Sequence, residues 1–216
     1  MNAPNQPLDT LADIKQMMHQ SSRFVSLSGW SGIAAGICAL TGAWIARQKI
    51  DEYILNSRSI YGHFNQGGLP GSERFPLTGQ LLTIALATLV AALILAFIFT
   101  YIRSAKTGIP IWGFTARRVL WNVAIPMLIG GLFILRMVHF GLYGLVAPAC
   151  LLFYGLALMN ASKYTLPEVR YLGYCQLLLG IINLWATSYG LYFWAAGFGV
   201  LHIAYGILMW NRYERH

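Results

Sequence analysis

Acidic side chains are scarce in this sequence, with seven aspartates and glutamates against fifteen lysines and arginines among 216 residues. None of the seven lies within a long apolar segment. Proton- and cation-driven transporters commonly carry carboxylates inside their membrane helices, so the sequence shows no site of that kind. The HExxH, P-loop and GxSxG patterns, from which hydrolase and nucleotide chemistry is recognised, are also missing. These absences weigh against an enzyme.

Cysteine is equally rare, and the three cysteines have neither an even number nor a metal-like spacing. Cys38, Cys150 and Cys175 all fall in apolar segments, where a thiol behaves as a small apolar side chain. We therefore expect no metal site, and no motif indicates a cofactor.

Long apolar runs dominate the chain, which is 57% hydrophobic and only 10% charged, whereas soluble domains carry about 25% charged residues. Backbone groups in lipid must be hydrogen-bonded within the chain, so each run is expected to be a helix. We predict an all-α bundle of six transmembrane helices over residues 24–46, 77–102, 119–135, 140–159, 171–187 and 189–210.

The rest of the chain divides around this transmembrane domain of residues 24–210. Residues 1–23 have the spacing of an amphipathic helix, which would lie on the inner membrane surface or dock against the bundle. Residues 47–76 are expected to be an external loop that includes a short interfacial helix. Residues 211–216 form a tail.

Arg136 and His139 are the basic residues of an otherwise apolar segment, 119–159. Its 41 residues are about twice the ~20 that cross a hydrocarbon core. The segment must therefore fold back on itself near its middle. We expect Arg136 and His139 at the outer rim of this hairpin, as solvated anchors or as contacts to an anionic group.

Lysines and arginines are distributed unevenly between the two sides of a six-span topology. Ten fall on the side of the two termini and five on the other side, which predicts cytoplasmic termini by the positive-inside rule. The net charge of +8 is thus explained by topology and by attraction to anionic lipids of the inner leaflet. We expect no nucleic-acid partner.

Ser28, Gly32 and Gly36 recur at four-residue intervals in the first span. Small side chains at this spacing let two membrane helices approach closely. The pattern predicts a tight helix contact, either within the chain or with a second copy or another membrane protein.

Polar residues inside the predicted spans are few. If a ligand pocket exists, the candidates to line it are Trp30, Asn122, Gln176, Asn183 and His202. Ionisable residues in membrane spans often mark functional sites. The alternative for His202 is a packed, hydrogen-bonded side chain with no ligand.

Four stretches that together cover most of the chain outside the external loop support a resemblance. They are SSRFVSLSGWSGIAAG, GIPIWGFTARRVLWNVAIPMLIGGLF, YGLALMNASKYTLPEVRYLGYCQ and GFGVLHIAYG. They resemble a family of small multi-spanning membrane proteins of the kind found in Bacteroidota. The resemblance implies a multi-pass protein of the bacterial inner membrane. It carries no established activity and no catalytic or binding residues.

Three functions are compatible with these features. The first is a membrane-embedded component that binds or transports a small or lipid-like molecule. The second is a non-catalytic structural or regulatory protein that acts through helix contacts with a partner. The third, and the least favoured, is an intramembrane enzyme or redox protein.

Overall fold

The computed structural model describes residues 28–63, 74–108 and 112–215, and all regular structure in these ranges is helical. The α-helices are α2 (Gly29–His63), α3 (Arg74–Thr107), α4 (Phe114–His139), α5 (Val146–Ala161), α6 (Glu168–Trp185), α7 (Gly190–Trp194) and α8 (Leu201–Tyr213). Two short 3-10 turns, η1 (Tyr143–Leu145) and η2 (Thr187–Tyr189), precede α5 and α7, and a π-helix, η3 (Ala195–Val200), joins α7 to α8. The predicted all-α class is confirmed, while the amphipathic segment expected over residues 1–23 lies outside the described ranges.

Within the described residues, five helical segments are long and apolar enough to cross a membrane: Gly29–Leu55, Leu77–Lys106, Phe114–His139, Tyr143–Ala161 and Thr187–Tyr213. These lengths and compositions are those of a multi-pass membrane protein. α6, the fifth of the six predicted spans, is not among the five. Its 18 residues include two charged and two amide side chains, Glu168, Arg170, Gln176 and Asn183.

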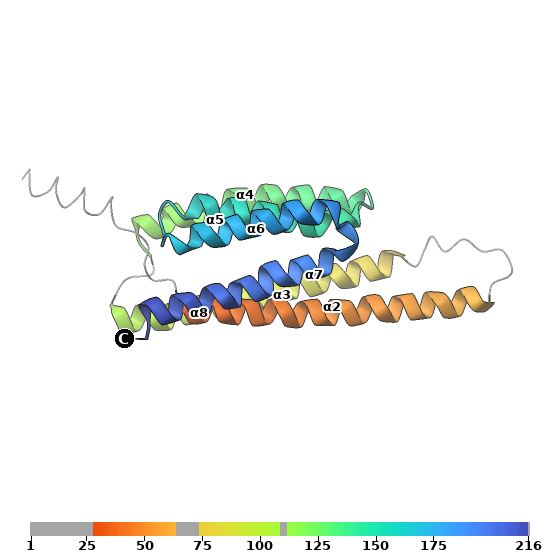
Figure 1. Ribbon diagram of the computed structural model, residues 1–216, viewed down its shortest axis with the longest axis horizontal. Coiled ribbons are helices and arrows are strands. Elements are labelled where there is room, and N and C mark those ends of the chain that lie inside the picture. Colours follow the sequence, from red (N-terminus) through yellow and green to blue (C-terminus); the bar gives the residue numbers. More distant parts are fainter. Residues whose placement is uncertain (1–27, 64–73, 109–111, 216) are drawn as a thin grey trace, which may run out of the picture.

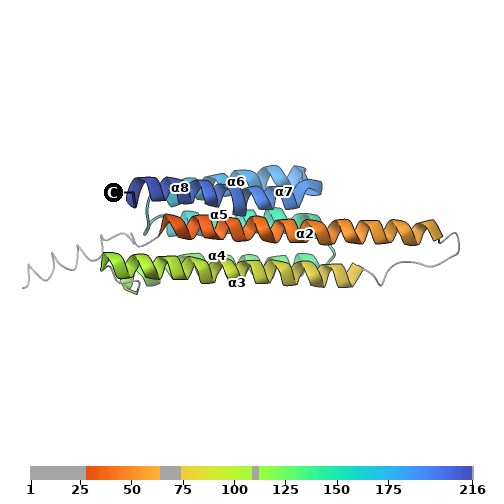
Figure 2. The same cartoon turned by 90° about the horizontal axis from the view of Figure 1, so that it is seen from below.

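The helices form two layers of three, seen in Figures 1 and 2. In one layer α5 lies between α4 and α6, and in the other α2 lies between α3 and α8. The layers contact each other where α7, η3 and α8 meet α5 and α6. The chain ends at the same end of the bundle at which α2 begins (Figure 1). We call this the Glu214 end, and the opposite end, which holds the turn between α4 and α5, the His139 end.

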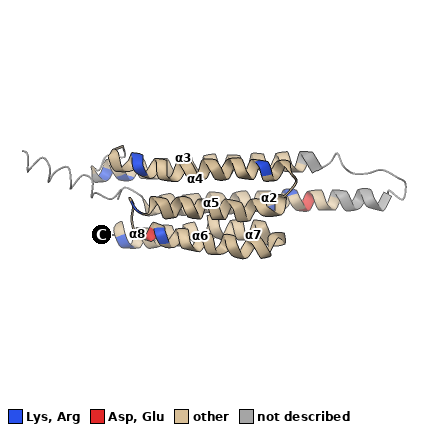
Figure 3. Cartoon of the chain, turned by 90° about the horizontal axis from the view of Figure 1, so that it is seen from above, with Lys and Arg blue, Asp and Glu red and all other residues tan. Residues whose placement is uncertain are grey.

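Charged residues avoid the middle of the bundle, as Figure 3 shows for the described residues. Arg136 and His139 lie in the last turn of α4, next to the turn into α5. Gly141 occupies this turn with a φ of 73°, a left-handed conformation that glycine adopts without steric cost. The segment 119–159 is therefore folded into a helical hairpin, as its length predicted.

The region 47–76, expected to be an external loop, is largely helical. α2 continues to His63 and α3 begins at Arg74, so α2 extends well beyond its neighbours at the His139 end (Figure 1). Pairs one turn apart support this extension, because Arg47 bonds Asp51 and Lys49 bonds Glu52 along the exposed helix surface. A short helix was expected within this region, but its continuity with α2 was not, because a charged amphipathic segment can continue a helix as readily as end it.

Two close helix crossings depend on glycine. In α2, a Cβ atom at Gly32 would lie 3.2 Å from Gly206 Cα, and one at Gly36 would lie 3.0 Å from Ile203 N. The row of Ser28, Gly32 and Gly36 thus faces α8 of the same chain. At the second crossing, between α5 and α6, a Cβ at Gly173 would lie 3.2 Å from the carbonyl oxygen of Gly155.

Candidate functional site

A polar cluster lies where α5, α6 and α8 meet the π-helix. The carbonyl oxygen of Gly197 accepts two side-chain hydrogen bonds, from Gln176 Nε2 at 2.8 Å and from His202 Nδ1 at 3.0 Å. The other ring nitrogen of His202 lies 2.8 Å from the hydroxyl oxygen of Tyr154. We call these four residues the Gly197 cluster. Side chains from three helices, α5, α6 and α8, are thus joined in one hydrogen-bonded cluster on the Gly197 carbonyl.

The backbone of η3 explains why one carbonyl can serve two side chains. A π-helix has wider turns than an α-helix and is most often a local bulge found at functional sites. The sequence of η3, AAGFGV, has small residues that leave space around the bulge, and Gly197 and Gly199 are both buried. A Cβ at Gly197 would lie 2.6 Å from Gln176 Oε1, so only glycine lets the Gln176 amide lie against the helix.

The hydrogen bonds and the burial of His202 together indicate its protonation. A carbonyl oxygen only accepts, so Nδ1 carries a proton in its bond to Gly197. His202 is buried and bonds no carboxylate among the described residues, which favours a neutral ring. In the neutral ring Nε2 is the acceptor and the Tyr154 hydroxyl donates to it, so the order of donation runs from Tyr154 through His202 to Gly197. Among the described residues, no group of three metal-ligating side chains is found.

Aromatic rings cover one side of the cluster. The Phe198 ring centroid lies 5.1 Å from that of Tyr154 and 6.0 Å from that of His202, and Trp194 lies 5.1 Å from Phe198. These rings give the polar groups an apolar wall on the side of η3, within which their hydrogen bonds are stronger than in water.

Some buried oxygens near the cluster have no hydrogen-bond partner among the described residues. Gln176 and Asn183 are fully buried, yet Gln176 Oε1 and Asn183 Oδ1 are unpartnered, and so is the hydroxyl of Tyr205. Buried polar groups usually have a hydrogen-bond partner, so these oxygens are the acceptors in this region that a ligand would bond first.

The candidate pocket residues from the sequence are only partly brought together. Gln176 and His202 meet at Gly197, and Asn183 is buried two turns further along α6, where its amide nitrogen donates to the Ala186 carbonyl. Asn122 instead bonds the carbonyl oxygen of Arg118 on its own helix. Trp30 is 48% exposed and contacts Trp210 edge-on.

Sequence reasoning missed two members of the cluster, Tyr154 and Gly197. Tyr154 resembles any other aromatic residue of a membrane span, and no sequence signal marks a π-helix in a run of small residues. The spacing between Gly197 and His202, five residues, equals the i→i+5 hydrogen-bond spacing of a π-helix. This spacing can be recognised as part of a π-helix only from the backbone structure.

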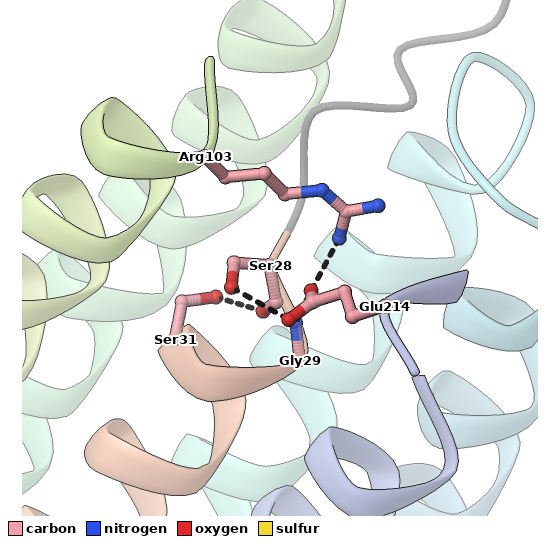
Figure 4. A network of polar contacts seen from close by, with 5 residues as sticks. All are labelled: Ser28, Gly29, Ser31, Arg103 and Glu214. Carbon is pink, nitrogen blue, oxygen red and sulfur yellow. Dashed lines mark hydrogen bonds and ion pairs between the residues drawn. The ribbon is translucent and has the colours of Figure 1, made fainter. Parts of the chain in front are cut away.

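A second network closes the Glu214 end of the bundle (Figure 4). Arg103 of α3 pairs with Glu214 at 2.5 Å, and the same carboxylate oxygen accepts the backbone N–H of Gly29 at 2.6 Å. Ser28 contributes a hydroxyl 3.5 Å from the second oxygen. A carboxylate at a helix N-terminus is stabilised by the helix dipole. Glu214 therefore joins the ends of α2, α3 and α8.

The predicted outer-rim residues, Arg136 and His139, lie in the last turn of α4, at the His139 end of the bundle. The Arg136 guanidinium carbon is 4.1 Å from the centroid of the Phe140 ring, and the His139 ring contacts Phe140 edge-on at 5.7 Å. Both residues are far from the Gly197 cluster in sequence and belong to the turn of the hairpin.

Comparisons with protein-family models, with curated proteins and with solved structures found no match to this chain. The resemblance to small bacterial membrane proteins therefore stays a prediction, and functional reasoning depends on the geometry.

Proposed function

We propose that this protein is a membrane-embedded component that binds or transports a small or lipid-like molecule, and that the Gly197 cluster is its site. The observation that carries the proposal is the convergence of Gln176 and His202, from two helices, on one backbone carbonyl. Polar side chains are expensive inside a membrane and are retained mainly where they serve a function.

The location and the backbone of the cluster support a role in transport. At 1.5 Å per residue, Gly197 lies roughly 10 Å from the start of α7 at Gly190 and roughly 24 Å from the end of α8 at Tyr213. Transporters commonly bind substrate where a membrane helix is interrupted and backbone groups become available. The π-helix of η3 is such an interruption, and Gly197 and Gly199 allow it to change shape.

The proposal includes six membrane spans, with α6 as the fifth. α6 packs between α5 and α8, and it runs alongside them in Figure 2. Its polar residues Gln176 and Asn183 face the bundle, so they need not contact lipid. With six spans both termini lie on one side.

Basic residues support cytoplasmic termini in a bacterial inner membrane. The described lysines and arginines at the Glu214 end are Arg103, Lys106, Arg117, Arg118, Lys163, Arg170, Arg212 and Arg215, whereas Arg47, Lys49 and Arg136 have described side chains at the His139 end. Cytoplasmic segments carry the excess of positive charge.

The function is tested by what co-purifies with the full chain. Wild type, Gln176→Leu and a control, Asn122→Leu, are extracted from their membranes in mild detergent, and the bound small molecules are measured by mass spectrometry. Asn122 is a suitable control because its amide bonds only its own helix. We expect a compound enriched in wild type and Asn122→Leu and depleted in Gln176→Leu. Equal profiles in all three proteins would contradict the proposal.

A second candidate function, a structural or regulatory protein that contacts a partner through its helices, is favoured by α3. This helix packs on α2, and none of its most apolar stretch is buried. A photo-crosslinking residue at Phe97, which is 62% exposed, would capture a second copy or another membrane protein. Crosslinking to lipid alone would count against this function.

A further inference from the structure

The basic residues of the Glu214 end differ in whether a carboxylate neutralises them. Arg103 pairs with Glu214, and Arg212 pairs with Glu168. Four exposed basic residues in and next to the layer of α4, α5 and α6 form no ion pair with a described carboxylate: Arg117, Arg118, Lys163 and Arg170. The two described carboxylates at this end, Glu168 and Glu214, are thus already paired with other arginines. The larger share of the excess positive charge thus belongs to this layer, and Lys106 and Arg215 carry the rest in the other layer.

Arg118 is the most constrained of the four. Its guanidinium carbon lies 4.1 Å from the Phe114 ring centroid and 5.8 Å from the Tyr164 ring centroid. Phe114 is one turn earlier on α4, and Tyr164 belongs to the connection between α5 and α6. The five N–H donors of a guanidinium lie in the plane of the group, so aromatic rings on its face leave these donors directed outward. Within the described part of the chain no acceptor engages these donors.

The position of Arg118 matches the headgroup region of a membrane. It lies in the second turn of α4, between Trp112 and Trp121, which are 67% and 60% exposed. Exposed tryptophans are typical of the membrane–water interface. A planar guanidinium at this depth fits the phosphate of a phospholipid, with which it forms two parallel hydrogen bonds.

We propose that Arg118, held between Phe114 and Tyr164, binds the phosphate of an anionic phospholipid headgroup. Lys163 adjoins Tyr164 and Arg117 adjoins Arg118, so the site carries more positive charge than one phosphate neutralises. A lipid with a net negative charge is therefore favoured over a zwitterionic one, whose own ammonium offsets its phosphate. This site is separate from the Gly197 cluster and does not depend on the function proposed for it.

α4 supplies its own control at the opposite end. Arg136 lies over Phe140 at 4.1 Å, the same distance and the same one-turn spacing as Arg118 over Phe114. No second ring brackets Arg136 among the described residues, and its basic neighbour on α4 is His139. Arg136→Gln therefore removes an equivalent arginine from a site that lacks the other features.

The test is native mass spectrometry of the full-chain protein in detergent, titrated with phosphatidylglycerol or with phosphatidylethanolamine. We expect wild type to bind phosphatidylglycerol first and more tightly. Arg118→Gln should weaken this binding about fivefold, which is the effect of one basic residue near an anionic surface. Arg136→Gln should leave it unchanged. Because Arg118 is exposed, its substitution should not alter the thermal unfolding midpoint, and Tyr164→Leu provides a second, charge-conserving variant that weakens binding.

Three results would overturn the inference. They are equal weakening by Arg118→Gln and Arg136→Gln, equal affinity for the two lipids in wild type, and unchanged binding in both Arg118→Gln and Tyr164→Leu. Inorganic phosphate at millimolar concentration separates the two sources of a phosphate group. Displacement of phosphatidylglycerol by inorganic phosphate would indicate a site for the free ion and would contradict the lipid assignment, whereas no displacement supports it.

Discussion

Helices α3 and α6 combine composition and burial in opposite ways. The most apolar stretch of α3 has a mean hydropathy of 2.8, and none of it is buried. α6 is not among the helices whose composition suits a membrane span, yet six of its residues are buried: Val169, Leu172, Gly173, Gln176, Gly180 and Asn183. The very apolar helix α3 is thus exposed along that stretch, whereas the less apolar helix α6 buries one face against its neighbours.

The difference shows what hydropathy measures in a membrane protein. Lipid selects apolar side chains on any surface that it touches, because polar groups there have no hydrogen-bond partner. A helix face that packs against other helices can carry glycine and amide side chains, which permit close approach and bonds between helices. The glycine and amide side chains of α6 lie on such a buried face, so its polar composition follows from its packing against its neighbours. The following substitutions test this comparison.

The largest effect is expected from filling the contact between α5 and α6. Gly173→Leu should lower the free energy of unfolding by about 3 kcal/mol, because overpacking costs 1–3 kcal/mol and a Cβ atom alone would lie 3.2 Å from the Gly155 carbonyl oxygen. The control is Gly79→Leu in α3, where a Cβ atom meets nothing within 4 Å. Thermal unfolding in mild detergent measures both. Equal midpoints for the two variants would show that α6 is no more closely packed than α3.

The sequence predicts much of this fold and little of the site. Apolar runs identify most of the helices, and the length of 119–159 identifies the hairpin, because both follow from the thickness of the membrane. The continuation of α2 to His63 was not predicted, since ion pairs along its exposed surface replace the apolar signal. Gln176 and His202 stand out as polar residues in apolar segments. Their meeting at Gly197 depends on a π-helix and on the packing of three helices, which no local pattern specifies.

A smaller effect is expected from the hydrogen bond between Tyr154 and His202. His202→Phe should cost about 2 kcal/mol, because it leaves the buried Tyr154 hydroxyl unpartnered. Tyr154→Phe should cost less, and the double variant should cost less than the sum of the two. A double-mutant cycle measures the coupling, which is 0.5–3 kcal/mol for residues in one network.

The matching control lies in α3. Thr83 donates its hydroxyl to the Gly79 carbonyl of its own helix, so Thr83→Ala should change stability very little. Additive effects for Tyr154→Phe and His202→Phe would contradict the hydrogen bond on which the description of the Gly197 cluster depends.

The smallest effect is expected from the network that holds α3 at the Glu214 end. Glu214→Gln should lower stability by about 1–2 kcal/mol, because a charge-assisted hydrogen bond is worth 1.5–3 kcal/mol and the Glu214 side chain is still 15% exposed. Arg212→Gln is the control, since the Arg212 side chain is 70% exposed and surface pairs contribute about 0–1 kcal/mol. Hydrogen exchange should rise in the last turns of α3 in Glu214→Gln. If it rises equally in Arg212→Gln, Glu214 does not anchor α3.

The proposed six-span topology and the proposed location of the Gly197 cluster inside the membrane both depend on whether α6 crosses the membrane. This crossing is tested most directly by the sidedness of single cysteines at the two ends of α6, in a protein whose native cysteines are replaced by alanine. Lys163→Cys and Ser188→Cys are exposed positions that flank the helix. A membrane-impermeant maleimide added to intact cells should label Ser188→Cys and should reach Lys163→Cys only after the cells are opened. Labelling of both cysteines from the same side would show that α6 does not cross the membrane.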